Sequence, residues 1–196
     1  MAAVQCIVGL GNPGDRYCNT RHNVGQWCID QLAQQHQLTY RLDKKLGVHV
    51  AALPTVHGTC YLAKPTSYMN ESGLPVARLA RFYRIPAEAL LVMHDELDFA
   101  PGIARLKQGG GHGGHNGLRD IKQHLPGDFI RLRLGIGHPG HADQVSGYVL
   151  GVPRAEEQVL IQQAIEAALA QMPQLFADNF NAAAKALHTE PGVSSC

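Results

Sequence analysis

Two glycine-flanked loops each carry a histidine beside an asparagine. The first contains Thr20-Arg21-His22-Asn23 and follows a turn that holds Asn12, and the second contains His115-Asn116. Histidine suits proton transfer near neutral pH because its unperturbed pKa is about 6.5, and a carboxylate that fixes its orientation makes it an effective base. His94-Asp95-Glu96, at the end of an apolar run, offers that carboxylate. If the loops converge, the sequence predicts a pocket in which asparagine amides polarise a carbonyl and an imidazole accepts a proton.

The sequence offers no protein nucleophile for such a pocket. It contains no G-x-S-x-G elbow and no cysteine with a nucleophile signature. Its five cysteines are odd in number, scattered and without a C-x-x-C pair, so they predict neither a disulfide framework nor a cysteine zinc site. Direct attack by water is the chemistry that these residues favour.

The glycine-rich segments raise a nucleotide-binding alternative. G-x-G-x-x-G occurs twice, at Gly9, Gly11 and Gly14 and at Gly109, Gly111 and Gly114. Pro13 and a polar run to Arg21 delay the helix after the first match, and no acidic residue follows the second at the required offset, so a dinucleotide site is disfavoured. A P-loop is disfavoured too, because His115-Asn116 stands where Lys-Ser/Thr is required. The six glycines in 109–117 indicate either close approach of a ligand or a flexible loop.

A zinc hydrolase is a further alternative. Among eleven histidines, His112-x-x-His115 could join a carboxylate in an open zinc site. However, H-E-x-x-H is absent, and glycine-rich chain does not hold two ligands on one helical face. We therefore expect catalysis without a metal and without any other cofactor.

Composition describes a globular protein. The chain has 196 residues, of which 45% are hydrophobic and 17% charged, which is enough apolar material for one core. No apolar run approaches the roughly 18 residues of a membrane span, and the first ten residues lack a signal-peptide pattern. We expect a cytoplasmic protein that does not bind membranes, with one domain over residues 1–188 and a flexible tail over 189–196.

Charge is distributed unevenly along the chain. The net charge is +1, but residues 101–140 hold six Lys and Arg against two Asp, whereas residues 150–196 hold two basic and five acidic side chains. Four histidines also lie in the basic stretch. By itself this stretch predicts either an ordinary solvated face or an anion-binding one.

Apolar runs and helical periodicities alternate along the sequence. Strands are expected at 4–10, 47–53, 59–64, 90–94, 103–107 and 130–136, with the second and third forming a hairpin. Helices are expected from residue 24 to 35, from 72 to 83, and at 118–125, 155–171 and 174–188, the last two separated by Pro173. This order predicts an α/β sandwich in which helices flank a mixed β-sheet.

Five segments resemble the motifs of bacterial-type peptidyl-tRNA hydrolases, in the order in which that family carries them. They begin with Val8-Gly9-Leu10-Gly11-Asn12-Pro13-Gly14, which is followed by Tyr17 and Thr20-Arg21-His22-Asn23-Val24-Gly25. The others are Lys64-Pro65-Thr66-Ser67-Tyr68-Met69-Asn70-Glu71-Ser72-Gly73, His94-Asp95-Glu96-Leu97-Asp98, residues 109–120 and residues 131–140. The resemblance spans residues 4–151, and the connection at 125–129 is short for the family.

The resemblance implies an activity and a fold. The activity is hydrolysis of the ester that joins a peptide to the terminal ribose of tRNA, which recycles tRNA from prematurely released peptidyl-tRNA. The fold is a single α/β domain with a twisted mixed sheet, and the enzyme is a monomer that needs no metal.

The resemblance also implies roles for individual residues. His22 resembles the catalytic base, Asp95 its orienting carboxylate, and Asn12 an amide that positions substrate and water. The residues implied to bind substrate are Tyr17, Tyr68, Met69, Asn70, His115 and Asn116. Lys107 and Arg133 resemble the pair that clamps the 5′ phosphate of tRNA, which fits the basic stretch.

A tRNA-binding module without catalysis would use the same groove and the same basic patch. Such a module would need neither His22 nor Asp95, and both are present. The sequence therefore favours the enzyme.

Overall fold

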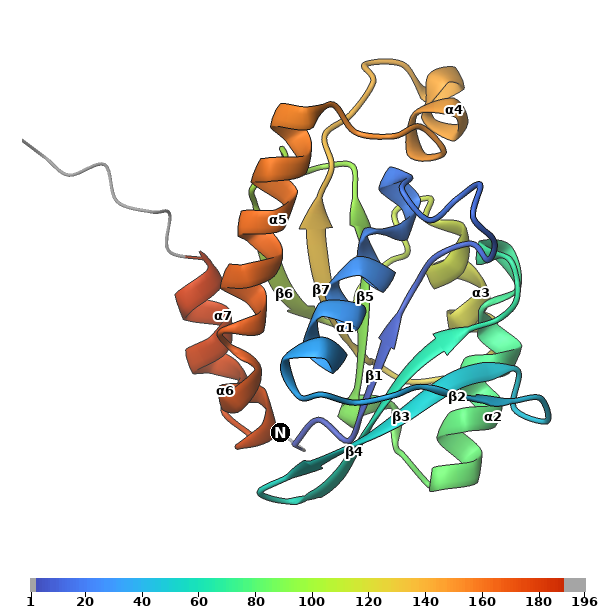
Figure 1. Cartoon of the computed structure of the whole chain (residues 1–196), viewed down its shortest axis with the longest axis vertical. Helices are drawn as coiled ribbons and strands as arrows, with labels where there is room; N and C mark the ends of the chain where they lie inside the picture. Colours follow the sequence, from blue (N-terminus) through green and yellow to red (C-terminus); the bar gives the residue numbers. More distant parts are fainter. Residues whose placement is uncertain (1–2, 189–196) are drawn as a thin grey trace, which may run out of the picture.

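A computed structural model describes residues 3–188, so the tail expected at 189–196 lies outside the described residues. In this part of the chain, seven strands form one sheet in the order β2-β3-β4-β1-β5-β7-β6 (Figure 1). The strands are β1 (Cys6–Gly9), β2 (Arg41–Asp43), β3 (Val48–Thr55), β4 (Gly58–Pro65), β5 (Leu90–Glu96), β6 (Ala104–Gln108) and β7 (Ile130–Gly135).

The sheet is mixed, as the sequence predicts. Strands β4, β1, β5 and β7 run parallel to one another, whereas β2-β3, β3-β4 and β6-β7 are antiparallel pairs. The two central strands, β1 and the first four residues of β5, are apolar throughout because helices cover both faces of the sheet there. The expected hairpin is β3-β4, and β2 is an edge strand that the sequence analysis did not anticipate.

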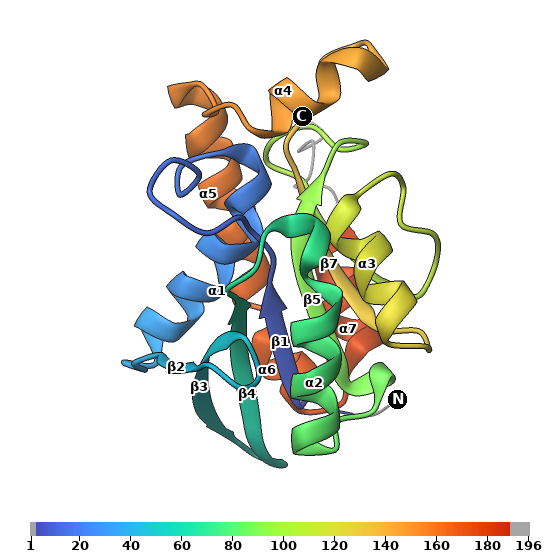
Figure 2. The same ribbon diagram turned by 90° about the vertical axis from the view of Figure 1, so that its right-hand side faces the viewer.

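Helices cover both faces of the sheet (Figures 1 and 2). One face packs against α1 (Val24–Gln35), α5 (Ala155–Leu169), α6 (Met172–Phe176) and α7 (Phe180–His188), and their apolar side chains form one buried cluster with it. The other face packs against α2 (Gly73–Tyr83) and α3 (Asn116–His124) around a second buried cluster. The short helix α4 (Val145–Val149) lies beyond the carboxyl end of β7.

The helices expected on either side of Pro173 are separated, but the break lies before the proline. Helix α5 ends at Leu169, and Pro173 lies in the first turn of α6. A proline fits there because the backbone N–H that it lacks has no partner in the first turn of a helix. The single helix expected over 174–188 is instead divided into α6 and α7, and Asp178 between them has a φ of 57°.

No helix within residues 3–188 has both the length and the apolar character to cross a membrane. All four cysteines in this range are free thiols.

The carboxyl ends of β1 and β5 lie next to each other, because the two strands are parallel neighbours in register from Cys6 and Leu90 to Gly9 and Met93. Helix α1 packs closely across these ends. A Cβ on Gly25 would overlap the carbonyl oxygen of Met93, and a Cβ on Gly9 would overlap Ile29. Glycine at these two positions therefore lets the start of α1 approach the end of β5.

Candidate active site

A cleft of about 620 Å³ opens at this edge of the sheet. Its volume is in the range of small-molecule sites, about 300–1,000 Å³. Seven of the eleven residues to which the resemblance gives a role line it, namely Asn12, His22, Met69, Asn70, Asp95, His115 and Asn116, and His112 lines it too. The two glycine-flanked loops therefore converge as expected.

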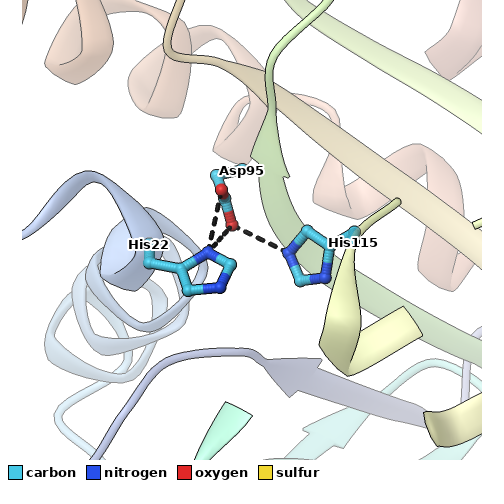
Figure 3. Close-up of side chains that lie close together, drawn as sticks. All are labelled: His22, Asp95 and His115. Carbon is cyan, nitrogen blue, oxygen red and sulfur yellow. Dashed lines mark hydrogen bonds and ion pairs between the residues drawn. The ribbon is translucent and has the colours of Figure 1, made fainter. Parts of the chain in front are cut away.

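His22 reaches the cleft from a short 3-10 turn, η1 (Arg21–Asn23), that leads into α1. Its Nδ1 lies 2.9 Å from each carboxylate oxygen of Asp95. Because a carboxylate only accepts, Nδ1 carries the proton, and the unprotonated Nε2 lies on the side of the ring away from Asp95 (Figure 3). The geometry thus fixes both the tautomer and the direction of a potential base.

His115 binds the same carboxylate. Its Nε2 lies 2.8 Å from Asp95 Oδ1, while its Nδ1 accepts the backbone N–H of Leu118 at 3.3 Å as the N-cap of α3. The Nδ1 contact requires a lone pair, so the proton of His115 is on Nε2 and is donated to Asp95. The His22 and His115 rings lie 5.0 Å apart on the two sides of Asp95 (Figure 3).

The electrostatics of this trio follow from burial and pairing. Burial alone would raise the pKa of Asp95, but the two histidines hold this pKa well below its ordinary value. Burial opposes protonation of His22, but attraction and hydrogen bonding to Asp95 prevail and raise the pKa of His22. Asp95 is therefore a fixed negative charge, and His22 is a stronger base than a free imidazole.

His94 is a support that the sequence analysis did not identify. Its Nδ1 donates to the backbone oxygen of Asp95 at 2.7 Å, and burial, followed by the proximity of His115, lowers the pKa of His94 to about 3. A neutral His94 packs its ring against His115 at 5.1 Å. Its position directly before Asp95 was the only sequence signal available.

Asn12 is held with its amide oriented. Its Oδ1 accepts the backbone N–H of Met69 at 2.8 Å, and its backbone N–H and C=O are both bonded to the side chain of Asn23 at 2.9 Å. No acceptor within residues 3–188 is bonded to Asn12 Nδ2. The cleft-lining amide of Asn12 therefore has a donor available. Asn23 was not singled out from the sequence, although it lies beside His22.

The other cleft residues come from two helix starts. Met69 and Asn70 belong to the 3-10 turn η2 (Met69–Glu71), and Asn116 is the first residue of α3. Met69 is buried in the core and also lines the cleft. Its sulfur packs over Gly117, and a Cβ on Gly117 would lie only 2.6 Å from this sulfur. Asn70 and Asn116 are exposed at the mouth.

Tyr17 and Tyr68 do not line this cleft. Their rings meet edge to face at 6.3 Å, and Tyr68 is 53% exposed. Tyr68 directly precedes Met69, so the pair forms a surface next to the cleft.

The backbone conformation of the loop at residues 109–117 explains most of its glycines. Gly109, Gly110, Gly113 and Gly114 have positive φ, a region that glycine occupies at little cost. Arg131 Nη1 donates to the carbonyl of Gly111 at 2.7 Å, and Lys122 donates to that of Gly110. Backbone geometry and packing thus account for these glycines without requiring close approach of a ligand.

The proposed phosphate residues lie on adjacent strands outside the cleft lining. Lys107 is exposed on β6 opposite Arg131 of β7. Arg133 is half-buried, with Nε donating to Glu96 Oε2 at 2.8 Å and its guanidinium 4.4 Å from the centre of the Phe99 ring. The partially buried Arg133 therefore already has an anionic partner, whereas Lys107 presents its charge to solvent.

Three side chains of the cleft have the types that bind metal ions. Ligand atoms of His22, Asp95 and His115 all lie within 4.8 Å of one another. His112, the other half of the expected H-x-x-H pair, is not in this group, and its Nδ1 accepts the backbone N–H of Gly114 at 3.1 Å. In the present arrangement, both histidine nitrogens that face the carboxylate hold protons.

Comparison with known proteins identifies close relatives. The profile of the family "Peptidyl-tRNA hydrolase" matches residues 6–194. A peptidyl-tRNA hydrolase of Coxiella burnetii (strain CbuG_Q212) is 50% identical over 187 residues, which cover 95% of this chain and 98% of the relative. One of Pseudomonas paraeruginosa is 50% identical over 192 residues, covering 97% and 99%. The crystal structure of peptidyl-tRNA hydrolase from Acinetobacter baumannii superposes with a TM-score of 0.93 at 45% identity, covering 96% of each chain.

Proposed function

The chain belongs to the peptidyl-tRNA hydrolase family, and we propose that it hydrolyses peptidyl-tRNA with a water molecule that His22 deprotonates. The observation that carries this mechanism is the bond from His22 Nδ1 to both oxygens of Asp95, 2.9 Å each, beside an open cleft. The products are the free peptide acid and reusable tRNA.

The base acts through Nε2. As Nε2 takes a proton from water, the imidazole becomes a cation, and the buried negative charge of Asp95 stabilises it. The hydroxide adds to the ester carbonyl, the tetrahedral intermediate collapses, and the proton on His22 passes to the departing ribose oxygen. Each atom of water thus ends in a product, and His22 returns to its starting state.

The asparagine amides suit the other demands of this reaction. Asn12 Nδ2 is an uncharged donor held in place by its bond to Met69, so it can orient water or the carbonyl without reorganising. Asn70 and Asn116 at the mouth are suited to hold the ester and peptide backbone, with Met69 as an apolar surface beneath them. Tyr17 and Tyr68 would extend this surface to the next part of the substrate.

His115 has two proposed parts in the site. It binds substrate from the cleft wall, and its bond to Asp95 holds the carboxylate in place for His22. Because Asp95 accepts from both rings, its orientation is fixed before substrate arrives.

The tRNA body is proposed to bind over β6 and β7. Lys107 is free to pair with a phosphate, and Arg133 would exchange or share its contact with Glu96 when the phosphate arrives. Because Lys107 and Arg133 lie away from the ester, their contact with the phosphate would contribute to the binding of tRNA more than to the hydrolysis step.

No metal is required in this mechanism. The buried carboxylate supplies the stabilisation of charge, and His22 Nδ1 and His115 Nε2 both donate to Asp95. We further propose a cytoplasmic monomer in which residues 1–188 form one catalytic domain.

Purified protein incubated with an N-blocked aminoacyl-tRNA distinguishes the enzyme from a tRNA-binding module. We expect the ester to be cleaved with multiple turnovers. Retention of the tRNA with an intact ester would favour the binding module and reject the proposed function.

A further inference from the structure

The residue immediately before His22 is a buried arginine. The side chain of Arg21 is 9% exposed, and that of its partner Glu157 is 13% exposed. A guanidinium is costly to bury unless it is paired and hydrogen-bonded, so its surroundings must compensate it.

Arg21 makes four links to the segment that follows β7. Its Nη2 donates to Glu157 Oε2 at 2.7 Å, and its Nη1 donates to the backbone oxygen of Tyr148 at 3.3 Å. Its Cζ lies 4.1 Å from the centre of the Tyr148 ring. Its backbone N–H donates to the carbonyl of Gly151 at 3.0 Å. The Tyr148 hydroxyl in turn donates to the carbonyl of Ile136 at 2.6 Å.

The segment held in this way is a wall of the cleft. Val145, Ser146, Val149 and Leu150 line it together with the asparagines and His115. Within residues 138–150 only Val149 is buried, and Val145 and Tyr148 pack partly buried against the same core cluster, so most of the segment is exposed. Figure 1 shows α4 beyond the end of the sheet, away from the helices that cover its faces. Besides the packing of these three side chains, the segment is held by part-buried polar links, which include those of Arg21.

We propose that Arg21 is a positioning residue that holds the wall formed by residues 142–150 against the loop carrying His22. This inference rests on the proposed function, since the wall matters for catalysis only if the cleft holds the substrate. Fixing the wall keeps the width of the cleft constant, and thereby sets the affinity for the end of the substrate that lies between Val149 and the base.

Arginine is required for this role because one planar group makes three contacts at once. It donates from two nitrogens to two acceptors while its face lies on an aromatic ring. Lysine in its place would keep the charge opposite Glu157 but would lose the stacking and the fixed fork. We therefore expect the conservative variant Arg21→Lys to loosen the wall.

Two readouts on Arg21→Lys test the proposal. Amide hydrogen exchange over residues 142–150 should become roughly tenfold faster, because the segment opens locally more often, while exchange in α1 is unchanged. KM for N-blocked aminoacyl-tRNA should rise roughly tenfold. By contrast, kcat should change by less than about twofold, and the pH midpoint of kcat/KM should shift by less than about 0.3 pH units.

Arg154→Gln is the matched control. Arg154 also binds Glu157, through Nη2 at 3.3 Å, but its side chain is 75% exposed and it does not contact Tyr148. This variant should leave exchange and KM unchanged. If Arg21→Lys does not fold, Glu157→Gln removes the anionic partner and should change both readouts in the same direction.

Unchanged exchange over residues 142–150 in both Arg21→Lys and Glu157→Gln would overturn the proposal. A loss confined to kcat or to the pH midpoint would also overturn it, because Arg21 would then act on His22 and not on the wall. The exchange measurement needs no activity, so its outcome is independent of whether the protein hydrolyses peptidyl-tRNA.

Discussion

Oδ1 of Asp95 accepts hydrogen bonds from both His22 and His115, lying 2.9 Å from His22 Nδ1 and 2.8 Å from His115 Nε2. The carboxylate thus joins the η1 loop to the N-terminus of α3. The two histidines it binds, His22 and His115, are 93 positions apart in the sequence. Since His115 also caps α3, its ring cannot turn away without exposing a backbone donor. The carboxylate beside the proposed base is therefore held from both sides.

Replacing His22 by Ala should lower kcat by about 10²- to 10⁴-fold, the range expected for loss of a general base. KM should change little, because the cleft retains its amides and Met69. Steady-state kinetics on N-blocked aminoacyl-tRNA measures both quantities. Turnover near that of the native protein would remove His22 from the mechanism.

Exhaustive chelation should leave hydrolysis intact. The proposed base is an imidazole oriented by Asp95, and no step of the mechanism uses a Lewis acid. Activity is to be compared before and after dialysis against a strong chelator, with metal content determined on the same sample. Loss of activity that zinc restores would instead assign a metal to His22, Asp95 and His115.

Lys107→Ala should raise KM for whole peptidyl-tRNA, spare kcat, and reduce the slope of log affinity against log salt by about one. The same change should not affect a minimal peptidyl-nucleotide substrate. Arg133→Ala is expected to act similarly, although it also leaves Glu96 without its partner. Lys45→Ala removes an equal charge from an exposed site near the opposite edge of the sheet and serves as the control. Equal losses on both substrates would show that Lys107 and Arg133 support the fold or the chemistry and do not clamp a phosphate.

Gly25→Ala should destabilise the fold by about 1–3 kcal/mol, the usual cost of overpacking, because its Cβ would overlap the Met93 carbonyl. The start of α1 would shift away from β5 and take His22 with it, so activity should fall as well. Gly147→Ala in α4 is the control, since no atom lies within 4 Å of a Cβ there. Chemical denaturation of the two variants provides the comparison, and equal stabilities would show that α1 does not need this close approach.

The sequence predicted the parts of the fold that depend on local pattern. Strand β1 and the first four residues of β5 are apolar runs, β7 alternates apolar residues with Arg131 and Arg133, and the β3-β4 hairpin has a turn at Val56-His57. Strand β2 was missed because it has three residues and Leu42 is 48% exposed, so it carries no apolar alternation. The helix break expected at Pro173 lies at residues 170–171, because a proline is compatible with the first turn of the next helix.

In the cleft, too, the features that depend on local motifs were predicted, whereas the contacts between distant segments were not. The residues expected at its centre are there because their motifs end strands or start helices, and these positions meet at one edge of a parallel sheet. The sharing of Asp95 by His115 and the links of Arg21 to Tyr148 and Glu157 were not predicted. These contacts join segments up to 136 positions apart, and no periodicity or motif encodes such a distance.

The pH dependence of kcat/KM in Asp95→Asn tests the central claim most directly, because this profile reports the essential base of the free enzyme. Asp95 raises the pKa of His22, so the native profile should lose activity as pH falls through a midpoint above about 6.5. The amide removes that attraction and leaves burial, which disfavours the imidazolium. Its midpoint should therefore move to lower pH, with a maximal rate reduced by about 10²- to 10⁴-fold. A midpoint and a maximal rate equal to those of the native protein would contradict the pairing of His22 with Asp95 as the origin of catalysis.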